Sequence, residues 1–203
     1  MKIGIMGGTF NPIHNGHLML GEYAYRQFEL DEVWFMPNGT PPHKSNPDIC
    51  QLTVHRVLMT KLAIEDIPYF KICTYESDSD GLSYSYKTME HFKEIYPEHE
   101  FYFIIGADSL FTLQEWKCPE RLLPIVIILA AYRDDTDTET KMEQQIERLD
   151  KLYHGDIRLL RTPIMSVSSS EIRKRIKAGM DCRTMVPEKV LKYIQKHQMY
   201  QGD

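Results

Sequence analysis

The sequence lacks the close cysteine pairs of a disulfide scaffold or of a zinc site. Its four cysteines, Cys50, Cys73, Cys118 and Cys182, are scattered along the chain with no C-x-x-C pair. This spacing is typical of reduced thiols in a cytoplasmic protein. We therefore expect a cytoplasmic location, and a chain of 203 residues is long enough to bury a sizeable core without disulfides.

The sequence also lacks a long hydrophobic run and an excess of basic charge. The apolar residues 3–6 are too few for a signal peptide, and no stretch is long enough to cross a membrane. The formal net charge is −5 at pH 7, which argues against nonspecific nucleic-acid binding, because such binding depends on basic surface. We therefore expect no membrane and no nucleic-acid partner.

Apolar strand segments alternate with helical segments along the whole chain. The predicted strands are residues 3–6, 32–36, 69–74, 101–105, 125–130 and 157–160. The predicted helices are residues 17–28, 54–64, 85–96, 142–152, 169–177 and 187–197, and the polar residues 134–140 are expected to form an exposed loop. Alternation with uniformly apolar strands is typical of a parallel sheet covered by helices. We predict an α/β fold with a Rossmann-like, doubly wound parallel sheet, helices on both faces and a small C-terminal helical part.

The length suits a single domain spanning residues 1–203. Within it we expect a parallel α/β core at residues 1–163 and C-terminal helices at residues 164–203. In sheets of this kind, ligands bind outside the carboxyl ends of the strands. The segments that follow the predicted strands are therefore the candidates for a functional site.

The first such segment, from Gly7 to His17, carries the features of a phosphate-binding turn. Its glycines let backbone N–H groups approach an anion closely. The next helix is expected to begin near Gly16, so that its free N–H groups and its dipole favour the same anion. His14 and His17 add donors that can be charged or neutral near pH 7.

Two other interpretations of this segment stay open. Two histidines three residues apart could be metal ligands, although zinc would need a third ligand, and the turn could be purely structural. The segment resembles the H-x-G-H signature of the nucleotidyltransferase superfamily, with Asn11 where Asp is commoner. The resemblance implies one ATP-binding set, in which His14 and His17 are catalytic: Gly7, Gly8, Thr9, Phe10, His14, Gly16 and His17.

Four later stretches are similar to one branch of that superfamily, the bacterial nicotinate-mononucleotide adenylyltransferases. With the first segment, they run in order over residues 3 to about 195. The resemblance implies a single nucleotidyltransferase domain that joins ATP and nicotinate mononucleotide to give nicotinate adenine dinucleotide (deamido-NAD) and pyrophosphate in NAD biosynthesis. The matching stretches are Pro41–Lys44 (P-P-H-K), Leu82–Met89, Phe103–Trp116 and Val167–Arg173.

Two of these stretches supply candidates for the ATP side. Asp108 follows Gly106 just after a predicted strand, where a carboxylate can accept hydrogen bonds from ribose hydroxyls. Ser168, Ser169 and Arg173 lie at a predicted helix start and can form a triphosphate seat, although capping alone explains one serine. The resemblance implies that all five bind ATP and that Arg173 is also catalytic.

The candidates for the acceptor side have structural alternatives. Lys44 offers a point charge for a phosphate but could be an ordinary loop lysine. Ser85 opens a helix whose free N–H groups can hold a carboxylate, and a plain cap explains it equally well. The resemblance implies that Trp116 stacks on the pyridine ring, and Arg133 matches a family arginine less distinctively. The full acceptor set is His43, Lys44, Tyr84, Ser85, Tyr86, Trp116 and Arg133.

Lys87 departs from the family pattern, which usually has an acidic residue there. A cation in a first helical turn opposes the helix dipole. Lys87 therefore either points to solvent or faces an anion, and we state as a hypothesis that it helps to hold the acidic substrate.

The implied reaction makes few chemical demands on side chains. The substrate phosphate is itself the nucleophile, so no protein nucleophile is needed. The chain has to align two anions and neutralise charge that develops toward pyrophosphate. Mg²⁺ is expected to arrive with ATP and to be held by the nucleotide, so we predict no protein metal site.

Three rival functions and the oligomeric state stay open. A phosphopantetheine adenylyltransferase shares the fold, but it usually has Thr in place of His14 and lacks P-P-H-K. A nicotinamide-mononucleotide adenylyltransferase would use the same aromatic stack. A non-enzymatic nucleotide sensor would not need His17 and Arg173 intact. The apolar face of the predicted last helix can pack internally or form a homo-oligomer with a second copy.

Overall fold

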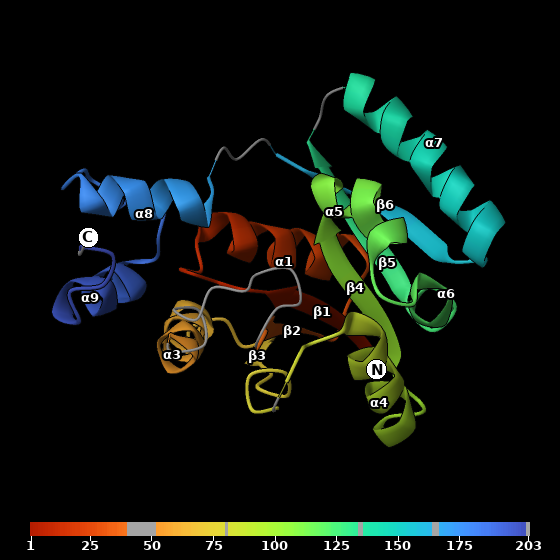
Figure 1. Cartoon of the computed structure of the whole chain (residues 1–203), viewed down its shortest axis with the longest axis horizontal. Helices are drawn as coiled ribbons and strands as arrows, with labels where there is room; N and C mark the ends of the chain where they lie inside the picture. The colour runs from red at the N-terminus through yellow and green to blue at the C-terminus, as the bar shows by residue number, and fades with distance from the viewer. Residues whose placement is uncertain (40–51, 80, 134–135, 164–166, 202–203) are drawn as a thin grey trace.

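The structure is a computed structural model that describes residues 1–39, 52–79, 81–133, 136–163 and 167–201. Six parallel strands form one sheet in the order β3-β2-β1-β4-β5-β6 (Figure 1). The strands are β1 (Lys2–Gly8), β2 (Glu32–Pro37), β3 (Phe70–Ile72), β4 (Glu100–Gly106), β5 (Ile127–Arg133) and β6 (Asp156–Thr162). In this register Ile5 of β1 lies between Trp34 of β2 and Phe103 of β4.

Helices cover both faces of the sheet, because side chains on both sides of the central strands are apolar and must be buried. The helices of one face are α1 (Asn15–Gln27), α3 (Thr53–Ile64), α8 (Ser169–Lys177) and α9 (Glu188–Lys196). The other face carries α4 (Ser85–Ile95), α5 (Ala107–Thr112), the 3-10 turn η1 (Leu113–Glu115), α6 (Pro119–Leu122) and α7 (Thr136–Tyr153). The predicted doubly wound α/β class is therefore confirmed.

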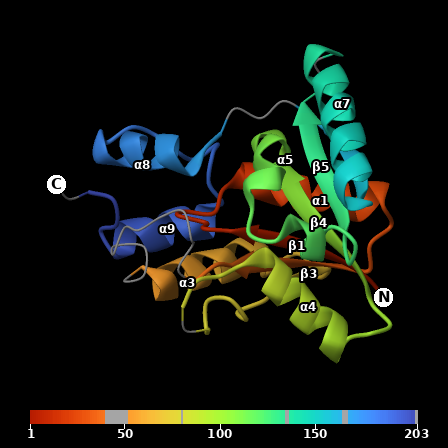
Figure 2. The same cartoon turned by 45° about the vertical axis from the view of Figure 1, so that its right-hand side comes forward.

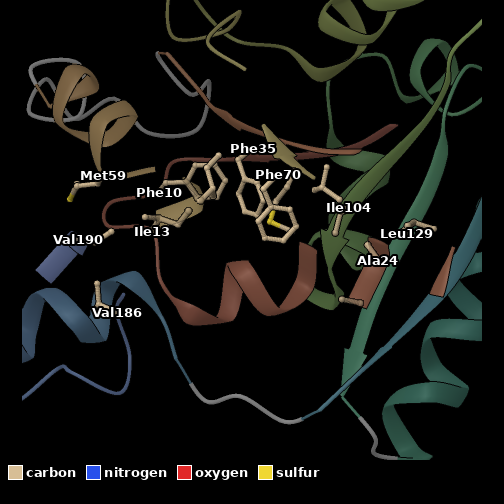
Figure 3. Packing of buried hydrophobic residues seen from close by; sticks show 14 of the residues in the cluster. Phe10, Ile13, Ala24, Phe35, Met59, Phe70, Ile104, Leu129, Val186 and Val190 are labelled. Atoms are coloured by element: carbon tan, nitrogen blue, oxygen red, sulfur yellow. The ribbon is translucent and has the colours of Figure 1, made fainter. Parts of the chain in front are cut away.

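Each face has its own hydrophobic core. Figure 3 shows part of the first core, where Phe10 and Ile13 lie between Phe35 of the sheet and the C-terminal residues Val186 and Val190. Val190 is fully buried, so α9 packs its apolar face inside the chain. In Figures 1 and 2, α8 and α9 lie at one end of the molecule beside α3, and α7 lies at the other end.

Three local predictions need correction. The polar residues 136–140 belong to the first turns of α7 and are not a loop; helical and loop surfaces are equally polar when both face water. The third strand is limited to Phe70–Ile72, three residues against the six predicted. The fifth strand begins at Ile127, two residues later than predicted, and extends to Arg133.

The order of the strands reverses between β1 and β4. The chain moves from β1 to β2 and β3 on one side, and returns to β4, β5 and β6 on the other. Loops that leave the carboxyl ends of β1 and β4 therefore separate in opposite directions and leave a crevice, the usual ligand site of such sheets. Within the described part of the chain, every helix is too short or too polar to cross a lipid bilayer.

Candidate active site

A cavity of about 1040 Å³ opens at this reversal point, outside the carboxyl ends of β1 and β4. It brings together predicted residues from segments that are far apart in the sequence. The predicted residues in its wall are Gly7, Gly8, His14, Gly16, His17, Tyr84, Ser85, Gly106, Asp108, Trp116, Ser168 and Ser169. Both the proposed ATP set and the proposed acceptor set are therefore represented around one cavity.

The remaining predicted residues lie elsewhere. Thr9, Phe10, Tyr86 and Arg173 are outside the described wall of the cavity. Phe10 is 2% exposed, and its ring meets the ring of His17 edge-on with the centroids 4.9 Å apart. It therefore supports His17 from the core side. His43 and Lys44 fall outside the described residues, as does the side chain of Arg133 at the end of β5.

The two histidines are held as a stacked pair at the start of α1. Their ring centroids are 3.7 Å apart and the planes are inclined by 25°. The backbone N–H of His14 donates to Nδ1 of His17 at 3.2 Å, so the proton of the neutral His17 ring is on Nε2. A Cβ on Gly16 would lie 3.0 Å from Nδ1 of His14, so a larger residue at position 16 would press on the ring.

Burial keeps both imidazoles neutral near pH 7. It lowers the pKa of His14 from 6.5 to about 4. It also lowers the pKa of His17 well below 6.5, and repulsion from a charge on His14 lowers it further. In addition, Nδ1 of His14 has no hydrogen-bond partner among the described residues. The histidines thus offer neutral donors and acceptors at pH 7. The sequence alone left open whether their rings are charged or neutral at this pH.

The two predicted serines at the start of α8 have different roles. The hydroxyl of Ser168 accepts from the backbone N–H of Glu171 at 3.2 Å, so Ser168 is the cap of α8. The hydroxyl of Ser169 donates to the carbonyl of Pro12 at 2.8 Å. Both side chains also face the cavity, so the start of α8 forms one wall and is tied to the turn of the histidines.

The C-terminal part fixes Asn11 in that turn at two atoms. Arg173 donates from Nη1 to the carbonyl of Asn11 at 2.7 Å. The hydroxyl of Tyr200 donates to Oδ1 of Asn11 at 2.5 Å, and burial raises the pKa of this phenol. Sequence reasoning missed Tyr200, because a tyrosine near the end of a chain carries no signal of a contact at residue 11.

A buried arginine on α3 ties the same turn to the end of β2. Arg56 is completely buried and donates to the carbonyls of Thr9 at 2.7 Å, Asn38 at 2.6 Å and Gly39 at 3.2 Å. Gly39 is required here, since a Cβ would lie 2.5 Å from the carbonyl oxygen of Glu76. Sequence reasoning missed Arg56, because an arginine in an amphipathic helix usually faces water.

Trp116, Tyr84 and Ser85, which the sequence predicts to bind the acceptor, lie in the part of the wall formed by α4 and by the segment that follows η1. Trp116 stands edge-on against Phe103 of β4, with the centroids 6.1 Å apart and the planes at 81°. Glu76, which sequence reasoning missed, is buried in the same wall and accepts from the hydroxyl of Thr88 at 2.8 Å. Burial raises the pKa of this carboxyl group.

Lys87 does not belong to this wall. Its side chain is exposed, and its ammonium lies 5.7 Å from the centre of the Tyr84 ring. The structure therefore favours the solvent-facing alternative for Lys87.

The fold and the cavity define a nucleotidyltransferase-like α/β protein, and residues 5–175 match the model of the cytidylyltransferase-like family. A relative from Bacillus subtilis, named nicotinate-nucleotide adenylyltransferase, is 38% identical over 99% of each chain. A relative from Lachnoclostridium phytofermentans, named "Probable nicotinate-nucleotide adenylyltransferase", is 44% identical over 98% of each chain. The chain therefore belongs to the nicotinate-nucleotide adenylyltransferase family, as the sequence predicts.

A solved structure agrees with the fold. Plasmodium falciparum nicotinic acid mononucleotide adenylyltransferase, described as complexed with NaAD, superposes with a TM-score of 0.79 over 100% of this chain and 98% of that chain. The two sequences are 22% identical, so this likeness supports the fold and leaves the roles of individual residues to chemical argument.

Proposed function

We propose that this protein transfers the adenylyl group of ATP to nicotinate mononucleotide and releases pyrophosphate, as a step of NAD biosynthesis. The observation that carries the proposal is a single cavity with two unlike walls. One wall presents the histidine pair and the start of α8, which suit a triphosphate, and the other presents Trp116, which suits a flat ring. The curated relatives are named for the same reaction.

The reaction needs alignment more than acid–base chemistry. The phosphate of the mononucleotide attacks the α-phosphorus of ATP; the new P–O bond forms while the bond to the β-phosphate breaks, and pyrophosphate leaves with the electron pair. The incoming phosphate is already ionised near pH 7, so no general base is required. Holding both anions in line contributes several kcal/mol of barrier reduction.

In this proposal the histidines bind phosphate oxygens as neutral donors. His17 presents the N–H of Nε2, because its Nδ1 already accepts from the backbone of His14. A neutral ring costs less to keep in a buried wall than a charged one, and its hydrogen bond strengthens as charge develops on the leaving pyrophosphate. Arg173 donates to Asn11 from Nη1 and has further N–H groups to offer a phosphate.

We further propose that ATP enters as its Mg²⁺ complex. Among the described residues no group of three His, Cys, Asp or Glu side chains is placed to hold a metal ion. Asp108 and Glu76 are the carboxylates of the described cavity wall, and Glu76 is buried with its pKa raised. This donor set suits an ion held mainly by phosphate oxygens, where it would neutralise charge on the triphosphate.

Pyrophosphate release tests the proposal directly. The purified chain is incubated with Mg²⁺ and ATP together with nicotinate mononucleotide, nicotinamide mononucleotide or phosphopantetheine. We expect rapid release with nicotinate mononucleotide and formation of the dinucleotide in equal amount. Preference for phosphopantetheine would assign the chain to that rival reaction. Absence of release with every acceptor would favour a nucleotide sensor.

A further inference from the structure

Among the residues that the structure describes, the cavity wall carries little positive charge for a site proposed to receive two anions. Of the wall residues that the structure describes, Lys117 is the only lysine or arginine. The two histidines are neutral, and Asp108 and Glu76 are acidic residues. Within the described wall, Lys117 is therefore the cation available for direct charge pairing with a substrate.

Lys117 lies on the acceptor side of the cavity. It follows Trp116 directly, and both residues face the cavity together with Tyr84 and Ser85 of the α4 start. Its side chain is exposed and forms no hydrogen bond or ion pair with the described residues. The ammonium is thus available to a ligand whose ring lies against Trp116.

The segment that carries Lys117 is anchored to α4. Arg121 of α6 forms a double hydrogen bond with Glu90 of α4, at 2.8 Å from Nε and 2.7 Å from Nη2. The guanidinium carbon of Arg121 also lies 4.6 Å from the centre of the Tyr86 ring. These contacts hold α6, and the residues just before it, against the first turns of α4.

The start of α4 adds backbone hydrogen-bond donors to the same wall of the cavity as Lys117. The N–H groups of Lys87 and Thr88 are bonded to the carbonyl of Tyr84, whereas the N–H groups of Ser85 and Tyr86 come too early in the helix to have an acceptor within it. A carboxylate between Lys117 and this helix start would receive one full charge and two backbone donors. An uncharged amide would gain less from the ammonium.

We infer that Lys117 is the residue that selects a carboxylate on the pyridine ring of the acceptor, and hence nicotinate over nicotinamide. The inference rests on the proposed function and assigns its substrate preference to a side chain of this chain. Lys117 acts here through binding and takes no part in bond making.

The test compares four proteins: the wild type, Lys117→Gln, Lys117→Arg and Lys87→Gln. For each, kcat/KM is measured with nicotinate mononucleotide and with nicotinamide mononucleotide at saturating Mg²⁺-ATP. Loss of one charge-assisted contact should lower the nicotinate value for Lys117→Gln about tenfold and leave the nicotinamide value within about twofold. Lys117→Arg should keep the wild-type ratio because it keeps the charge. Lys87→Gln, which removes an exposed lysine outside the wall, should also keep it.

The ratio of kcat/KM for nicotinate mononucleotide to kcat/KM for nicotinamide mononucleotide separates this inference from the function on which it rests. A wild type that uses neither mononucleotide overturns the proposed function. A wild type that uses nicotinate mononucleotide well, together with an unchanged ratio in Lys117→Gln, overturns only the role of Lys117. Equal losses with both acceptors also overturn it, since they would reflect damage to the wall and not lost recognition of a carboxylate.

Discussion

The neutral state of His14 makes the stability of the ligand-free protein depend on pH in a defined way. Unfolded His14 takes up a proton as the pH falls through its ordinary pKa of 6.5, whereas folded His14 resists protonation until about pH 4. Between these values the unfolded chain binds more protons, so acid favours it. The stabilisation is therefore complete above pH 6.5 and is lost progressively down to about pH 4.

The size of this pH-dependent loss of stability follows from the lowered pKa of His14. At about 1.4 kcal/mol per pKa unit, the whole window corresponds to about 3 kcal/mol, of which about 2 kcal/mol is lost by pH 5. His14 as a whole residue is 7% exposed, so solvent screening reduces these values little.

Urea unfolding at pH 7 and pH 5 measures the effect, with His14→Asn as the matched control. Asparagine keeps the backbone N–H that binds His17 and does not titrate in this range. All other titrating groups are shared, so the difference between the two proteins reports the His14 imidazole together with its charge repulsion with His17. We expect the wild type to lose about 2 kcal/mol more than the variant on acidification. Equal losses in the two proteins would refute the argument that burial holds His14 neutral.

Three further predictions concern the turn and its supports. His17→Ala should lower kcat by about 100-fold, and near-wild-type turnover would remove its assigned role. Arg173→Ala should raise KM for ATP and lower kcat, together by about tenfold or more in kcat/KM; an unchanged ATP dependence in initial-rate assays would count against a phosphate contact. Tyr200→Phe should lower the free energy of unfolding by about 1 kcal/mol, measured with urea, whereas an unchanged value would mean that the bond to Asn11 is replaced by water without loss.

The fold was predictable because strand and helix signals in this chain are strong and alternate regularly. The apolar segments ending at Met6, Met36 and Ile105 are buried strands as expected. The predicted ends of helices and strands were less accurate where amino-acid composition does not distinguish a helix or strand from a loop. The start of α7 is as polar as a loop because it faces water, and β3 is cut short where it lies at the edge of the sheet.

The candidate site was predictable only where a residue belongs to a recognisable motif. His14, His17 and Trp116 fall in stretches that resemble a known family, and the structure gathers them around one cavity. Arg56, Glu76 and Tyr200 reach the turn or the wall from other elements, through contacts that depend on tertiary packing. Local sequence patterns contain no information about such partners.

The bond between Asn11 and Tyr200 joins residues 189 positions apart. Loop closure over such a distance pairs the turn that precedes the histidine pair with residues near position 200, so this turn is fixed at Asn11 only after α8 and α9 have docked. The same connection also couples nucleotide binding to the docking of the C-terminal helices. A nucleotide that binds only the folded site stabilises the folded state as a whole, so its binding should lower the equilibrium population of chains whose C-terminal helices have opened.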